Sequence, residues 1–119
     1  MSCVLEAGPY GRVRFAVRSS GRMPASDEWS NLGMQRQQSF RALFRRRVRQ
    51  AEVLSEDQFK KLPGTDSLWQ FRRSRLRFLA CWRDADILLL VVLTKGSQKL
   101  PKTERQRAEG ICADDMGRH

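Results

Sequence analysis

Three short apolar runs, separated by two polar breaks, stand out in the second half of the chain. The runs cover Leu68–Arg72, Leu76–Trp82 and Ile87–Leu93, and the breaks cover residues 73–75 and 83–86. Runs of this length, rich in aromatic and branched side chains, are typical of strands, and breaks of three or four residues have the length of hairpin loops. The pattern therefore predicts an antiparallel meander.

The first half of the chain predicts one strand and two helices. In Val13–Val17, the residues Val13, Phe15 and Val17 form one apolar face and the opposite face is partly basic, as in a half-buried strand. A short helix is expected from Ser26, which can cap it, to Leu32, because Gly33 can end it. From Met34 to Leu54, apolar residues recur at intervals of three and four and form one helical stripe.

The C-terminal part predicts a loop and one more helix. Glycine and proline between residues 94 and 102 indicate an exit loop after the last strand. Thr103 can cap a short helix over Glu104–Glu109, which Gly110 ends, and residues 111–119 are expected to form a loose tail. A chain of 119 residues has room for a single domain with one modest core.

The net charge of +10 and the sequence pI of about 10.8 indicate what kind of partner the protein binds. A small domain this basic is expected to meet phosphates or an acidic partner, and the alternative is a basic surface that only aids solubility. Six arginines and no acidic residue lie between Arg36 and Arg49. Such a helix face is most often solvated, but it can also contact an RNA backbone or an acidic protein segment.

The three cysteines, Cys3, Cys81 and Cys112, show no CxxC spacing. An odd number without a framework indicates a reduced, cytosolic protein and argues against a structural zinc site. Cys81 falls inside a predicted strand and is expected to be a small core residue. The N-terminus lacks the pattern of a secretory signal, and no apolar run is long enough to cross a bilayer. We therefore expect a cytoplasmic protein with no membrane partner.

Four motifs follow one another in a fixed order. They are GRMP at residues 21–24, LWQFR at 68–72, LRFLA at 76–80 and KGSQKLP at 95–101. This series resembles toxins of the RelE/ParE superfamily, particularly the HigB-like, phage-derived branch of type II toxin–antitoxin systems. The resemblance covers about the last 45 residues well and the first half only in outline.

The resemblance implies both a fold and a function. The implied fold is an α+β, RelE-like domain, a small antiparallel sheet with N-terminal helices packed on one face. The implied function is an endoribonuclease that cleaves mRNA on the translating ribosome, inhibits translation, arrests growth and needs no metal or cofactor. Its implied partners are mRNA, the ribosome and a cognate antitoxin of the acidic or helix-turn-helix type. The chain departs from the family pattern, in ways that bear on catalysis more than on fold, at Gln70, Ala80, Val91, Leu93 and Gly96.

The predicted strands and the closing loop also supply candidate catalytic residues. If the aromatic residues of the meander pack on the long helix, alternation places Arg72 and Arg77 together on the opposite face of the sheet. Arginine binds phosphate bidentately, so both could stabilise the charge of a pentavalent phosphate. Lys95 and Lys99 could approach this face from the closing loop and bind phosphate or transfer a proton. The alternative is a solvated strand face.

Further basic residues are candidates for RNA binding through the phosphate backbone. They lie in the loop before the meander, in its first hairpin, on the long helix and after the closing loop, and they are Lys60, Lys61, Arg75, Arg45, Arg46, Arg49 and Lys102.

Two alternatives to the nuclease remain within the same resemblance. One is a toxin that inhibits DNA gyrase by binding it. The other is a non-catalytic relative that binds RNA or the antitoxin, since polar and aromatic residues of the family are replaced in this chain.

Overall fold

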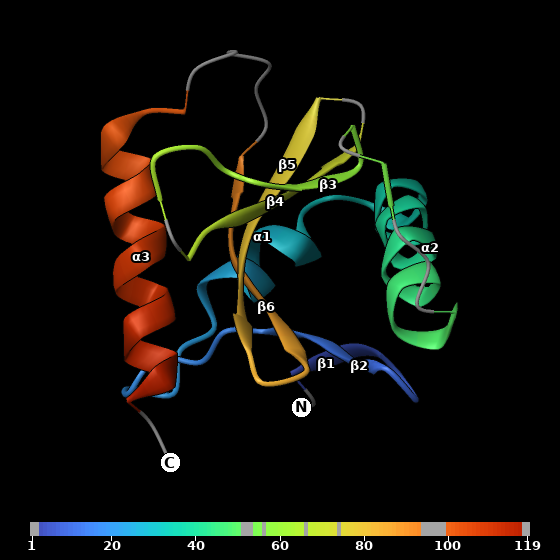
Figure 1. The fold of residues 1–119 in the computed structure, drawn as a ribbon, viewed down its shortest axis with the longest axis horizontal. Coiled ribbons are helices and arrows are strands. Elements are labelled where there is room, and N and C mark those ends of the chain that lie inside the picture. Colours follow the sequence, from blue (N-terminus) through green and yellow to red (C-terminus); the bar gives the residue numbers. More distant parts are fainter. Residues whose placement is uncertain are drawn as a thin grey trace.

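The computed structural model describes residues 3–50, 54–55, 57–65, 67–73, 75–93 and 100–117. Within these ranges two strands are followed by two helices, then by four strands and a last helix (Figure 1). No helix in the described ranges combines the length and apolar character that crossing a membrane requires. The elements are β1 (Val4–Gly8), β2 (Gly11–Phe15), α1 (Pro24–Ser30), α2 (Met34–Gln50), β3 (Phe59–Lys61), β4 (Trp69–Arg73), β5 (Leu76–Arg83), β6 (Asp86–Leu93) and α3 (Lys102–Met116).

The strands form one six-stranded sheet in the order β1-β2-β6-β5-β4-β3. All neighbouring strands are antiparallel except β2 and β6, which are parallel. The prediction of a simple antiparallel meander is therefore wrong, although β4, β5 and β6 do form the expected hairpins. The parallel pair joins residues more than 70 positions apart, such as Val13 and Ile87, with α1 and α2 in the connection. Local alternation carries no information on such a pairing.

Helices cover both faces of the sheet, which corrects the expectation of N-terminal helices on one face. Helices α1 and α2 follow the first two strands, and α2 lies on the side of the sheet opposite α3 (Figure 1). On the α2 side, the ring centroids of Phe44 and Phe71 are 5.0 Å apart and those of Phe40 and Phe78 are 4.7 Å apart. Aromatic residues of the meander thus pack on the long helix, which is the condition under which alternation places Arg72 and Arg77 on the opposite face.

Helix α3 packs on the other face and is much longer than expected. It runs to Met116, so the predicted stop at Gly110 and the loose tail from residue 111 are wrong. Ile111 and Ala108 are fully buried in a second core with residues of β5 and β6, among them Leu79 and Leu88. This packing outweighs the low helix propensity of one glycine, which costs about 1 kcal/mol.

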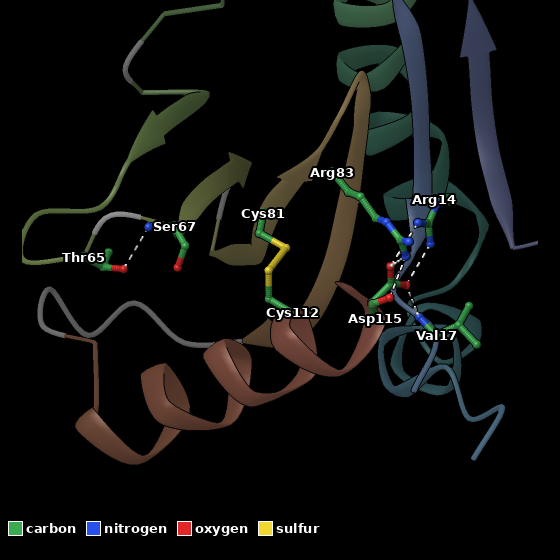
Figure 2. Close-up of a disulfide and its surroundings, with 8 residues drawn as sticks. All are labelled: Arg14, Val17, Thr65, Ser67, Cys81, Arg83, Cys112 and Asp115. Atoms are coloured by element: carbon green, nitrogen blue, oxygen red, sulfur yellow. Dashed lines mark hydrogen bonds and ion pairs between the residues drawn. A yellow bond between two sulfur atoms is a disulfide. The ribbon is translucent and has the colours of Figure 1, made fainter. Parts of the chain in front are cut away.

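A disulfide joins β5 to α3 (Figure 2). It links Cys81 and Cys112, whose Cα atoms are 6.4 Å apart, whereas Cys3 is free. The expectation of three reduced cysteines is therefore wrong, although Cys81 is buried as expected. The two cysteines are 31 residues apart and meet only because α3 folds back onto the sheet, which their spacing does not reveal.

An ion-pair network fixes the C-terminal half of α3 beside this disulfide (Figure 2). Asp115 is fully buried and accepts hydrogen bonds from Arg14 Nη1 at 2.9 Å, Arg83 Nη1 at 2.9 Å and the Val17 amide at 2.8 Å. Burial alone would raise the pKa of Asp115, but these donors outweigh it and lower the pKa from 3.8 to about 2. The network ties α3 to β2 and β5.

Candidate phosphate-binding pocket

A pocket of about 870 Å³ opens on the α3 side of the sheet. Strands β3, β4 and β5 supply one wall, and the N-terminal half of α3 supplies the other. Five of its lining residues are cationic and one is acidic. The lining residues are Lys60, Leu62, Pro63, Gln70, Arg72, Arg77, Leu100, Lys102, Arg105, Gln106 and Glu109.

Strand register brings the polar residues of the sheet wall together. Lys60 of β3 lies opposite Gln70 of β4, and Arg72 of β4 lies opposite Arg77 of β5. Because successive residues of a strand point to opposite faces, these four side chains share one face. Leu79 of β5 lies on the same face and packs in the core under α3, so this is the α3 face.

Arg77 is the most unusual residue of the pocket. It is 8% exposed, yet its guanidinium donates no hydrogen bond to a carboxylate or carbonyl oxygen of a described residue and forms no ion pair with one. Its direct neighbours in the sheet are Arg72 and Leu93, neither of which can compensate its charge. Its guanidinium nitrogens are not among the fully buried polar atoms that lack a partner, so they are accessible from the pocket, where an anion could bind them.

The helix wall presents polar residues at spacings of three and four. Lys102, Arg105, Gln106 and Glu109 therefore lie along one side of α3. Arg105 Nη2 donates to the carbonyl oxygen of Pro63 at 3.0 Å, which links α3 to the loop after β3. Its Nε is buried without a hydrogen-bond partner within the described ranges. The helix wall thus adds two cations that face the strand arginines.

Four of the predicted site residues meet in this pocket, and they are Arg72, Arg77, Lys60 and Lys102. Two others lie near it but outside its lining, Lys61 exposed at the end of β3 and Arg75 exposed in the β4–β5 hairpin. Lys95 and Lys99, and with them Gly96, lie outside the described residues. The sequence indicated that this face of the sheet is open to solvent. In the structure, α3 covers part of it.

The predicted RNA-binding arginines of α2 lie on the other side of the sheet from the pocket. Arg45 and Arg49 pair with the buried carboxylate of Glu6 in β1 at 3.3 and 3.7 Å, and Arg46 lies on the same helix. Arg49 also donates to the carbonyl oxygen of Ala7. Because β1 is an edge strand, these side chains cover polar groups that would otherwise be open.

The helix wall of the pocket was missed by sequence reasoning. Arg105, Gln106 and Glu109 fall in the predicted last helix, but nothing local shows that this helix returns to the sheet. The one signal in the sequence was the spacing of Arg105, Gln106 and Glu109, which places these polar residues on one side of the helix. Of the family departures, Gln70 lines the pocket, whereas Val91 is buried in the core under α3.

The described residues include no cluster of three or more histidine, cysteine, aspartate or glutamate side chains arranged to hold a metal ion. The pocket instead offers guanidinium, ammonium and amide groups, which suit a phosphate-containing ligand. No protein-family model matches the chain, and no curated protein matches it in sequence.

Proposed function

We propose that this protein is an mRNA endonuclease of the toxin–antitoxin type, which binds single-stranded RNA in the pocket between the sheet and α3. The observation that carries this proposal is Arg77, a buried arginine that lacks a described counter-ion and lies beside Arg72 in a pocket with five cations. The resemblance of the two strand motifs that contain these arginines to RelE-type toxins supports it further. The proposed setting is the translating ribosome, and the proposed regulator is a cognate antitoxin.

The chemistry uses a nucleophile that RNA itself carries. The 2′-oxygen forms a bond to phosphorus while the bond from phosphorus to O5′ breaks, which gives a 2′,3′-cyclic phosphate and a 5′-hydroxyl. The proton of the 2′-hydroxyl passes to a base, and O5′ takes up a proton. Arg72 and Arg77 would hold the non-bridging oxygens, where negative charge builds up in the transition state. Lys95 and Lys99 stay candidates for the proton transfers.

A second candidate function, RNA binding without cleavage, is favoured by one observation. Glu109 is the only carboxylate among the described residues that line the pocket, and it lies on the helix wall rather than beside Arg77 on the sheet. The described part of the pocket is therefore better equipped to hold phosphate than to move protons.

The test uses purified protein, a 5′-labelled single-stranded RNA and the variant Arg77→Met. Methionine keeps much of the volume of arginine without its charge, so the variant should fold with equal or higher stability. Loss of the guanidinium should reduce the cleavage rate by about 100-fold or more. Arg36→Ala, at an exposed position of α2, is the control and should cleave normally.

In cells, transcript 5′ ends mapped minutes after induction should show new ends within coding sequences for the unmodified protein and the control, but not for Arg77→Met. Growth arrest with intact transcripts would contradict the nuclease. Binding of RNA by the purified protein without any cleavage would favour the second candidate.

A further inference from the structure

Gln70 is the second polar side chain buried in the wall of the pocket. The residue is 3% exposed, it lines the pocket, and no side-chain hydrogen bond joins it to another described residue. Its amide atoms are not among the fully buried polar atoms that lack a partner, so they are accessible from the pocket. An amide that is open to the pocket and has no partner within the described residues is available to a ligand, as the guanidinium of Arg77 is.

The sheet register places Gln70 and Arg77 next to each other. Gln70 lies opposite Leu79, two residues along β5 from Arg77, so the two residues are diagonal neighbours on the same face. Diagonal neighbours in an antiparallel pair have Cα atoms about 7–8 Å apart, close enough for long side chains to reach a common ligand. A group bound to Gln70 therefore lies within a few ångströms of an anion bound to Arg77.

The chemistry of the two side chains differs and points to two parts of one ligand. The guanidinium of Arg77 donates only and suits a phosphate oxygen, whereas the Gln70 amide both donates and accepts and suits a hydroxyl. In a polynucleotide, the hydroxyl nearest to a phosphate is the ribose 2′-hydroxyl of the nucleotide on its 5′ side. The base lies farther away, across the sugar ring.

We propose that Gln70 and Arg77 form a ribose–phosphate subsite, in which Gln70 binds the 2′-hydroxyl of the nucleotide whose 3′-phosphate is held by Arg77. The 2′-hydroxyl is the group by which a protein distinguishes RNA from DNA. Gln70 is thus a specificity-determining residue that selects ribonucleotides before any bond is broken. This inference rests on the proposed function, because it takes RNA as the ligand of the pocket.

Nucleoside 3′-monophosphates are suitable probes, because they carry the 2′-hydroxyl and the 3′-phosphate but have no leaving group to lose. We would measure the affinity of the full chain for the four ribonucleoside 3′-monophosphates and their 2′-deoxy counterparts by calorimetry. One hydrogen bond between neutral groups should favour the ribonucleotides about three- to tenfold.

Three variants separate the roles of the two residues. Gln70→Met keeps the volume of the side chain and should reduce the ribose preference to about one without changing the affinity for deoxyribonucleotides. Arg77→Met should weaken both classes of nucleotide alike and keep their ratio. Gln35→Ala removes an exposed glutamine of α2, on the other side of the sheet from the pocket, and should keep both affinity and ratio.

The outcomes distinguish this subsite from the nuclease activity. An unchanged ribose preference in a folded Gln70→Met protein, or no preference in the unmodified protein, would overturn the subsite. If the preference depends on Gln70 but the protein cleaves no RNA, the subsite stands and the proposed nuclease fails. Thermal unfolding of each variant shows whether a loss of binding reflects a loss of structure.

Discussion

At the scale of single residues, two buried charged side chains have opposite surroundings. Asp115 is fully buried, and the side chains of Arg14 and Arg83 and the amide of Val17 donate hydrogen bonds to it. Arg77 is almost as buried but has no such partner among the described residues. Buried charges stabilise a fold only when they are paired. Asp115 therefore stabilises the fold, whereas Arg77 is available to a ligand.

Asp115 should make the stability of the protein depend on pH in the acid range. Its pKa is about 2 in the folded protein and about 3.8 when unfolded. A lowered pKa contributes stability that is fully present above pH 3.8 and is lost as the pH falls towards 2. The contribution is about 2 kcal/mol. In Asp115→Asn, the free energy of unfolding should be about 3 kcal/mol lower at pH 7, because Arg14 keeps only Asp86 as a counter-ion and Arg83 loses its charged partner at this site.

Urea unfolding at a series of pH values between 7 and 2 measures both effects. The asparagine variant should lose less stability than the unmodified protein between pH 4 and pH 2. Asp27→Asn, at an exposed position of α1, is the control and should follow the unmodified protein. Equal slopes for Asp115→Asn and the unmodified protein would contradict the role of the network.

At the scale of elements, sequence patterns predicted the strands whose pairing depends on residues close together in the chain. The alternation of the meander gave β4, β5 and β6 to within one residue at each end, and it placed Arg72 and Arg77 on one face. Strand β3 has only three residues, too few for a period to show. Strand β1 contains the buried Glu6, whose charge hides its strand character until the arginines of α2 are placed against it.

Contacts between distant segments could not be predicted in this way. The parallel pairing of β2 with β6 and the return of α3 to the sheet depend on packing between residues far apart in the chain. The helix wall of the pocket exists only because α3 packs back on the sheet, so Arg105 and Glu109 were missed as site residues. The disulfide between Cys81 and Cys112 also forms only because α3 packs there.

The disulfide should contribute to the stability of the docked α3. A cross-link between residues 31 positions apart restricts the unfolded chain and stabilises the fold by about 4 kcal/mol. The double variant Cys81→Ala and Cys112→Ala should lose this amount in denaturant unfolding, and reduction of the unmodified protein should have a similar effect. Cys3→Ala, which changes the free cysteine, should have no effect. Peptide mapping of the oxidised protein that pairs Cys3 with either partner would contradict the assignment.

At the scale of the whole molecule, the fold pairs some of its basic residues with carboxylates and gathers others in the pocket, where carboxylates are few. Glu6 pairs with Arg41, Arg45 and Arg49 on one side of the sheet, and Asp115 pairs with Arg14 and Arg83 on the other. The pocket, by contrast, gathers five cations around a single carboxylate. The net charge of +10 therefore does not act evenly over the surface. We therefore expect a polyanionic ligand such as RNA to bind at the pocket.

If the pocket binds RNA as proposed, this distribution predicts how that binding depends on salt. Each phosphate of a single strand that is neutralised by the protein contributes about −0.7 to the slope of log K against log salt. Five cations in the pocket allow a slope of up to about −3.5. Lys60 and Lys61 are adjacent in β3, but only Lys60 lines the pocket. Lys60→Ala should therefore make the slope shallower by about 0.7, whereas Lys61→Ala should leave it unchanged.

The measurement is fluorescence anisotropy with a labelled single-stranded oligonucleotide between 50 and 300 mM salt, roughly the range over which phosphate contacts are screened. A 2′-deoxy oligonucleotide prevents cleavage and should give the same slope, because the slope reports phosphates rather than sugars. If Lys60→Ala and Lys61→Ala change the slope equally, the two lysines act as interchangeable surface charges and the pocket is not the binding site. If Arg45→Ala also makes it shallower, the RNA extends across α2, and the footprint is larger than the pocket.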